Sequence, residues 1–269
     1  MSKILITSGC SFSECSSGPV DLETWTELHH ATWPQWLACR LKSHGFHDHV
    51  SKAMGSQGNG LISRGTIYAV CQALKTHQPE DILVGVMWSG SSRHDYICEN
   101  PQWLSFRDNP DPNWMDNPTG FVDGAEPRWV IMNHDWTNTE AATYYSKFHS
   151  FTGDTIYSLE HILRTQYFLK SKGVNYFFTN FVDNNIVDFH SEDYRKHQDQ
   201  IDYLYELIDF NNYLPVSSEL TWVHENSIYT DSEIHQHGPS HQWLHPESQQ
   251  HREFSDQVIY PYLLDRGYI

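Results

Sequence analysis

The chain has 269 residues, enough to bury one large hydrophobic core or two small ones. Hydrophobic residues make up 39% of it and aromatic residues 14%, which excludes an intrinsically disordered chain. Its 17 basic and 34 acidic residues give a formal net charge of −17. This charge argues against nucleic acid and anionic membrane surfaces as partners, because phosphate groups are bound through Lys and Arg.

No run of 18 apolar residues occurs, so the sequence predicts no transmembrane helix. The N-terminus enters directly into a strand pattern without the charged and apolar regions of a signal peptide. We therefore expect a cytoplasmic protein, or a virion-associated one if the chain is encoded by a phage. The cysteines are five in number and irregularly spaced, which predicts neither a disulfide framework nor a zinc site.

The first stretch, residues 3–13, predicts a buried strand followed by a tight turn. Ile4, Leu5 and Ile6 form an apolar run that Gly9 ends, and Ser11 follows directly. In open α/β sheets, ligands bind at the edge where the strands end. Ser11 is thus either a nucleophile at that edge or the N-cap of the next helix, since serine is a favoured capping residue.

The next segments alternate between helix and strand patterns. A helix is predicted from Thr32-Trp33-Pro34 to about His44, with Gly45 as its C-cap. A weak strand at 47–53 leads into a glycine-rich turn at 54–60, and apolar spacing predicts a helix over 61–77.

The most apolar strand pattern is Ile82–Trp88, as in a parallel strand covered on both faces, and it ends in a polar turn at Ser89–Arg93. Residues 94–150 are rich in Trp, Pro, Asn and Asp and show no long period, which predicts an insertion above the sheet.

The remaining segments return to regular patterns. They are a helix from Asp154 ended by Gly173, a strand at 174–181, a polar helical stretch at 192–210, a short strand at 220–223, and a terminal helix at 247–264. The order predicts an α/β fold with three layers, helices covering both faces of a parallel sheet of about five strands, in a flavodoxin-like arrangement. We expect one domain over residues 1–269 with the insertion at about 94–150.

Three turns would meet at one edge of this sheet. They are Gly9-Cys10-Ser11, Gly55-Ser56-Gln57-Gly58-Asn59 and Ser89–Arg93, and the late His245-Pro246 precedes the final helix. A hydroxyl nucleophile needs a base, usually histidine, and backbone N–H donors for the oxyanion. The turn glycine at position 55 lets its N–H group approach a ligand closely.

On these residues the chain resembles the SGNH (GDSL-type) hydrolases, and in particular divergent phage-encoded members. The resemblance covers the order of elements over most of the chain, but the motif matches amount to about ten residues. It implies Ser11 as the nucleophile, His245 as the general base, and the Gly55 and Ser11 N–H groups as oxyanion donors.

The chain departs from the family pattern in three places. Cys10 replaces the aspartate of the first motif, and no asparagine stands in the Ser89–Ser92 turn, so the third oxyanion donor is either missing or supplied by Asn59, Ser91 or Ser92. Gln242 stands where the family has the aspartate that orients the histidine. Gln242, Asp231 or Glu233 would then hold the imidazole, and loss of such a carboxylate lowers the rate without abolishing catalysis.

Other features have a structural and a functional interpretation. His235, His237, His241 and His245 resemble a metal cluster, but their spacing fits no standard zinc motif, and we favour polar loop histidines. Arg93 either binds a substrate group or pairs with a carboxylate, and we favour the pairing. The insertion tryptophans either stack on sugar rings or form the insertion's own core. Cys10 is a rival nucleophile, but adjacent residues point in different directions, and we favour Ser11.

The sequence therefore predicts a serine ester hydrolase without metal or organic cofactor, acting on a small ester such as an O-acetyl group of a carbohydrate. The alternative is a catalytically degraded relative with a binding or structural role in a phage particle. A sugar-binding module that works through the insertion is a third possibility, and oligomerisation stays open.

Overall fold

The protein is described by a computed structural model that covers residues 2–15, 31–98, 128–132, 139–183, 186–227 and 245–269. Within these ranges the main sheet has four strands, all parallel, in the order β2-β1-β3-β6. They are β1 (Lys3–Ser8), β2 (Phe46–Ser51), β3 (Ile82–Trp88) and β6 (Asn175–Asn180). Because β1 and β3 are neighbours at the centre, the turns that follow them open at the edge where ligands bind in such sheets.

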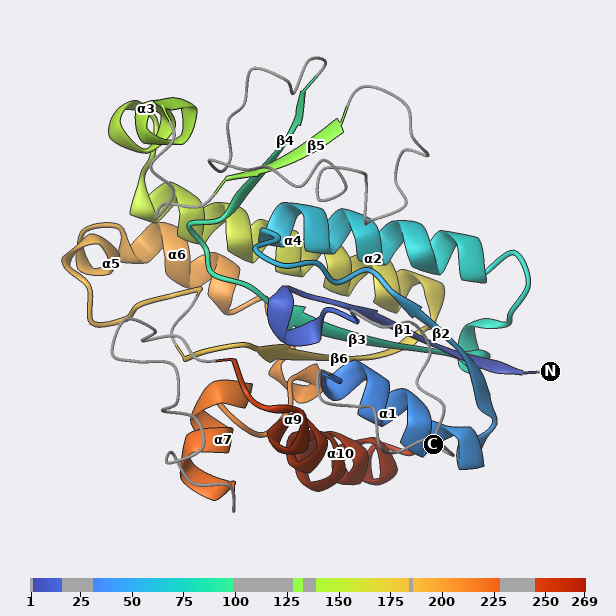
Figure 1. Ribbon diagram of the computed structural model, residues 1–269. Coiled ribbons are helices and arrows are strands. Elements are labelled where there is room, and N and C mark those ends of the chain that lie inside the picture. Colours follow the sequence, from blue (N-terminus) through green and yellow to red (C-terminus); the bar gives the residue numbers. More distant parts are fainter. Residues whose placement is uncertain (1, 16–30, 99–127, 133–138, 184–185, 228–244) are drawn as a thin grey trace.

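Helices cover both faces of this sheet, as Figure 1 shows. Helices α2 (Asn59–Ala73) and α4 (Phe151–Lys172) lie on one face, where they pack on Ile4, Ile6 and their neighbours. On the other face, α1 (Trp33–Leu41), α9 (Ser248–Phe254) and α10 (Tyr260–Asp265) pack around Leu5. The alternation of side chains along β1 thus supplies two cores, one on each face.

The core on the α1 face of the sheet depends on a glycine in the central strand. A Cβ atom at Gly85 of β3 would lie 2.5 Å from the ring of Phe177 and 3.1 Å from that of Trp33. Both rings are fully buried and meet edge to face, with centroids 5.9 Å apart. Position 85 therefore has to stay without a side chain for α1 to reach the sheet.

The start of α1, the turn that follows it and the end of α4 carry the signals that the sequence predicts. Thr32 and Gln35 form a capping box at the start of α1, and Gly45, at φ 87°, follows the 3₁₀ turn Lys42–His44. Gly173, at φ 67°, ends α4. The terminal helix is continuous from α9 through a π-helical turn at Ser255–Ile259 into α10.

The expected fifth strand at 220–223 is wrong. These residues lie in helix α7 (Glu219–Asn226), because the Ser218 hydroxyl accepts a hydrogen bond from the Thr221 N–H and so caps a helix there. The place beside β6 is taken by an isolated bridge between Tyr213 and Phe178, extended by a hydrogen bond from the Leu214 N–H to the Phe178 carbonyl. The sheet therefore has four strands rather than about five in the described residues.

The region 94–150 contains more regular structure than its sequence suggests. Strands β4 (His94–Cys98) and β5 (Arg128–Met132) form an antiparallel pair, and helix α3 (Thr139–Lys147) precedes α4. Asp95 of β4 accepts hydrogen bonds from the N–H groups of Gly58 (2.9 Å) and Leu61 (2.7 Å), which joins this region to the start of α2. The side chains of the insertion tryptophans lie outside the described part of the chain.

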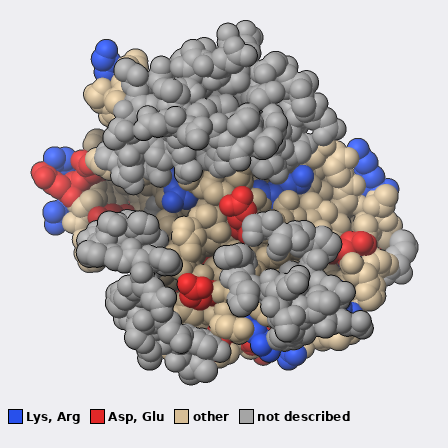
Figure 2. Space-filling view, in the orientation of Figure 1, with Lys and Arg blue, Asp and Glu red and all other residues tan. Residues whose placement is uncertain are grey.

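The polar stretch after β6 is helical, as predicted, with α5 (Glu192–Lys196) and α6 (Gln198–Tyr205) followed by a 3₁₀ turn at Phe210–Asn212. No helix in the described residues is long and apolar enough to cross a membrane. In Figure 2 acidic and basic side chains are interspersed, and the described residues form no broad patch of one sign on that face.

Candidate active site

Ser11 and His245, 234 positions apart in the sequence, lie together at the carboxyl edge of the sheet. Ser11 opens the 3₁₀ turn Ser11–Ser13 that follows β1, and its Oγ lies 2.5 Å from Nε2 of His245. His245 stands just before α9, partly open to solvent and with its ring packed against that of Phe12. A hydroxyl in hydrogen-bond contact with an imidazole is the geometry that a serine nucleophile and its base require.

The neighbouring hydroxyl and thiol are engaged elsewhere. Cys10 is fully buried in the core on the α1 face of the sheet. The Oγ of Ser13 accepts a hydrogen bond from the Trp33 indole N–H at 2.9 Å and is buried as well. Of the three side chains Cys10, Ser11 and Ser13, only that of Ser11 contacts the histidine.

The aromatic ring of Phe12 packs beside His245 and against the ring of Phe181. The ring of Phe12 lies 4.6 Å from that of His245 and 5.3 Å from that of Phe181, which follows β6. The guanidinium of Arg93 lies 5.2 Å above the Phe181 ring and donates a hydrogen bond to Ser89 Oγ at 2.8 Å. Phe181 therefore links the turn after β3 to the pair formed by Ser11 and His245, which is called the dyad below.

The surroundings of His245 favour its neutral form. Partial burial lowers the pKa of its imidazole below the usual 6.5, and the positive charges of His251 and Arg93 lower it further. A neutral imidazole accepts a proton from a hydroxyl, so the ring is poised as a base at neutral pH.

Gly55 lies beside the dyad, but its N–H group already has a partner. A Cβ atom at Gly55 would lie 3.9 Å from Cβ of Ser11, whereas the Gly55 N–H donates to Oε2 of Glu14 at 3.1 Å. Burial raises the pKa of Glu14, and the hydrogen bond from Gly55 opposes this rise. The next residue, Ser56, adopts φ 64°, a left-handed conformation that is uncommon for serine.

Asn59 and Ser91, two expected oxyanion donors, have their contacts with residues other than Ser11 and His245. The Asn59 side-chain amide is buried and donates to the Ser89 carbonyl (2.9 Å) and to Ser158 Oγ (3.1 Å), while its Oδ1 accepts from the Ser89 N–H (2.8 Å). Asn59 thus fastens α2 to the turn after β3. Ser91 lines a separate cavity of about 270 Å³ together with Phe151, Ile186 and Val187.

Several predicted residues lie outside the described part of the chain. They are Gln242, Asp231 and Glu233, together with His235, His237 and His241. Among the described residues, no group of three His, Cys, Asp or Glu side chains is arranged to hold a metal ion.

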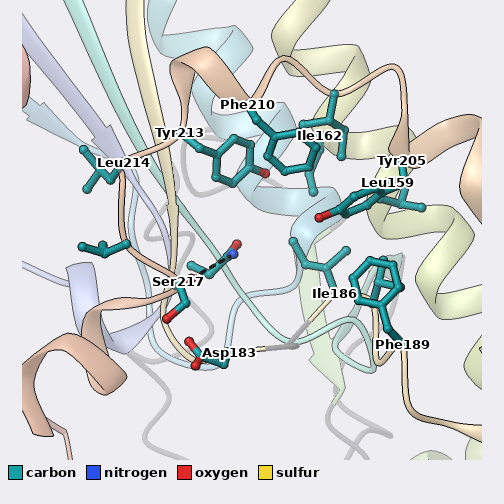
Figure 3. Close-up of a pocket in the computed structure, with 14 residues that line it drawn as sticks. Leu159, Ile162, Asp183, Ile186, Phe189, Tyr205, Phe210, Tyr213, Leu214 and Ser217 are labelled. Carbon is teal, nitrogen blue, oxygen red and sulfur yellow. Dashed lines mark hydrogen bonds between the residues drawn. The ribbon is translucent and has the colours of Figure 1, made fainter. Parts of the chain in front are cut away.

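A larger cavity of about 380 Å³ lies at the end of β6. Figure 3 shows Tyr213, Phe210, Tyr205 and Phe189 along an arc around it, with Asp183 and Ser217 together at one end. The rest of the lining is largely aliphatic: Leu159, Ile162, Ile186, Val187, Ile208, Leu214 and Val216, with Asn180 as a further polar residue. Asn180 directly precedes Phe181, whose ring contacts that of Phe12, so one chain segment runs from the cavity wall to the aromatic rings beside Ser11.

The polar end of this cavity carries a negative charge. Partial burial raises the pKa of Asp183, but the hydroxyls of Ser218, Ser217 and Thr221 outweigh it and hold the pKa below its usual range. The cavity therefore offers an apolar interior and an ionised carboxylate at one end.

Sequence reasoning missed Glu14, Phe12 and the buried pair of Glu219 and His251. Glu219 and His251 lie far from Ser11 in the sequence, and the contacts of Phe12 with His245, Phe181 and His251 join segments that only the fold brings together. Glu14 alone carried a local signal, as a carboxylate three residues after the predicted nucleophile.

Three solved structures resemble the chain. The YXIM protein of Bacillus subtilis has a TM-score of 0.47 at 15% identity, with 99% of this chain and 57% of that chain covered. TesA has a TM-score of 0.45 at 10% identity, with 99% and 100% covered. A GDSL-like lipase from Parabacteroides merdae has a TM-score of 0.35 at 10% identity, with 99% and 96% covered.

The chain thus spans little more than half of the Bacillus subtilis protein. With TM-scores below 0.5 these likenesses say nothing about activity, and the fold stands on the strands and helices described above. No curated protein matches the sequence. A family model described as a family of unknown function, DUF6071, matches residues 16–212, well over half of the chain, and the chain therefore belongs to that family.

Proposed function

We propose that the protein is a serine ester hydrolase. The observation that carries this proposal is the contact of 2.5 Å between Ser11 Oγ and His245 Nε2 at the carboxyl edge of the sheet. Ser11 Oγ attacks the ester carbonyl while His245 takes its proton and passes it to the leaving alcohol. Water then attacks the acyl-enzyme with His245 as base, which releases the carboxylic acid and restores Ser11.

Oxyanion stabilisation falls to backbone N–H groups, with those of Ser11 and Gly55 as the candidates. The Gly55 N–H becomes available when the Glu14 carboxylate leaves it, because one N–H cannot serve both acceptors well. Arg93 is a candidate for binding a polar substrate group, since its guanidinium lies over Phe181 next to the dyad.

The cavity at the end of β6 supports an ester with an apolar acyl group. Its aromatic and aliphatic lining favours a hydrocarbon chain, and about 380 Å³ is more room than an acetyl group fills. An O-acetyl group of a carbohydrate is the alternative substrate with a smaller acyl group, and its acetyl group would lie at the mouth of the cavity.

A second candidate is a binding protein without turnover. It is favoured by the engagement of the Gly55 N–H with Glu14 and of the Asn59 amide with Ser89 and Ser158, which leaves two of the expected oxyanion donors occupied.

The two candidates are separated by hydrolysis of p-nitrophenyl acetate and p-nitrophenyl hexanoate. We expect the wild type to turn these esters over and Ser11→Ala and His245→Ala each to lose at least about 10³-fold in kcat/KM. Ser43→Ala and His47→Ala, which change the same residue types at exposed positions, serve as controls and should keep the wild-type rate. Equal rates in wild type and all four variants would favour the binding protein.

A further inference from the structure

The protein buries a histidine–carboxylate pair beside the dyad. Nδ1 of His251, on α9, lies 2.6 Å from Oε1 of Glu219, the first residue of α7. Relative exposure is 0% for Glu219 and 3% for His251. The second carboxylate oxygen, Oε2 of Glu219, is buried and has no hydrogen-bond partner among the described residues.

Holding two helices together does not require such a pair. Helices α7 and α9 already meet through the rings of Trp222 and Phe254, whose centroids are 5.6 Å apart. They are also joined by a hydrogen bond of 2.7 Å from Ser227 Oγ to Glu253. A buried ion pair is often no more stabilising than apolar side chains of the same size, because both charges lose their hydration. Its presence therefore calls for a role other than docking.

One aromatic ring joins the pair to the dyad. Phe12 directly follows Ser11, and its ring lies 4.6 Å from that of His245 and 6.4 Å from that of His251, the latter edge to face at 90°. Phe12 itself is 3% exposed and packs in the core with Phe254. A displacement of the His251 ring would therefore be transmitted to the surface on which His245 rests.

The charge of His251 also links the buried pair to His245. Burial raises the pKa of Glu219, and the charge of His251 and its hydrogen bond oppose this rise. Among the described residues, the charged groups that affect His245 are His251 from α9 and Arg93 from the turn after β3, and both lower the pKa of its imidazole.

We propose that the Glu219–His251 pair positions His245 for reaction with Ser11, acting through the Phe12 ring. The proposal rests on the hydrolase function above. Among the described residues neither Glu219 nor His251 contacts Ser11, so they are positioning residues. In a Ser–His–Asp arrangement of this kind, a carboxylate three residues before the histidine orients the imidazole, and Gln242 occupies that place in this chain. The Glu219–His251 pair would orient the His245 ring instead, from the side of Phe12.

The first test is a side-chain NMR titration of His245 in wild type, Glu219→Gln and His251→Gln, with kcat/KM measured against pH in parallel. We expect the His245 midpoint to move to higher pH in His251→Gln, because the positive charge at position 251 that lowers the pKa of His245 is removed. We expect kcat/KM to fall about tenfold with little change in KM, a loss far smaller than that from removing a direct partner. Glu253→Ala, which removes the acceptor of the Ser227 hydroxyl between α7 and α9, is the matched control and should change neither readout.

A second variant excludes a purely structural effect. Replacing Glu219 by Met and His251 by Phe together removes both charges while keeping the space filled, and such replacements commonly preserve stability. We expect a folded protein with a shifted His245 midpoint and a reduced kcat/KM.

A wild-type midpoint and rate in this double variant would overturn the proposal. The titration needs no turnover, so an inactive wild type would contradict the hydrolase function while the coupling between the pair and His245 is still read out.

Discussion

Glu14 occupies the Gly55 N–H group, which the proposed hydrolysis assigns to the oxyanion formed at Ser11. Its carboxylate accepts the Gly55 N–H at 3.1 Å, and a second negative charge developing beside it would be repelled. We expect Glu14→Ala to raise kcat/KM at neutral pH by about tenfold, a fraction of the 10²- to 10³-fold that one oxyanion donor contributes.

The comparison is made with Glu206→Ala, which removes an exposed carboxylate elsewhere and should leave the rate unchanged. A loss of activity in Glu14→Ala would instead show that Glu14 is needed to hold the Gly55 turn in place.

At the scale of single elements, the proposed hydrolase function assigns the choice of acyl group to the segments after β6. The cavity there is lined by residues from α4, from 186–189 and from 205–217, and Val216 is a half-buried part of its wall. We expect Val216→Phe to lower kcat/KM for p-nitrophenyl octanoate about tenfold and to leave p-nitrophenyl acetate unchanged, because only the longer chain reaches into the narrowed space.

Val216→Ala, which widens the same place, is the control and should keep or raise the octanoate rate. An equal loss for acetate and octanoate in Val216→Phe would mean that the cavity does not receive the acyl chain.

At the scale of the whole molecule, His49 couples folding to pH. It lies on the edge strand β2, hydrogen-bonded with Thr7 Oγ1 at 2.9 Å, and burial lowers the pKa of its imidazole to about 4. Between about pH 6.5 and pH 4 the unfolded chain binds a proton at His49 that the folded chain does not, so the free energy of unfolding falls as the pH falls, by up to about 3 kcal/mol.

Asp95 acts in the opposite direction in part of this range. Burial raises the pKa of Asp95 to about 6, so between about pH 6 and pH 4 the folded chain binds a proton there that the unfolded chain does not. The effect of His49 is therefore isolated by comparing variants rather than by the wild-type curve alone.

Urea unfolding at pH 4.5 and pH 7.5 makes this comparison. We expect His49→Gln, which keeps a hydrogen-bonding side chain, to unfold with a smaller loss of stability between the two pH values than the wild type. His47→Gln, on the same strand but exposed, should follow the wild-type pH dependence. Parallel curves for wild type and His49→Gln would contradict the assignment.

The sequence by itself determined the elements whose signals are local. The strands β1, β3 and β6 are continuous apolar runs, and α4 carries an apolar stripe that ends at Gly173, so their places could be predicted without knowledge of their neighbours. The pairing of Ser11 with His245 was also predictable, because the parallel topology fixes which turns share an edge and the family resemblance points to both residues.

Only the tertiary structure decided the rest. The short apolar run at 220–223 is compatible with a strand or a helix, and the cap by Ser218 and the contacts of α7 with α9 select the helix. The partner of the Gly55 N–H, the engagement of Asn59 with Ser89 and Ser158, and the burial of Glu219 beside His251 depend on distances between remote segments, which no local pattern encodes. Local sequence patterns therefore predict the candidate reacting residues, Ser11 and His245. The packing of remote segments determines which neighbouring groups are already engaged in hydrogen bonds.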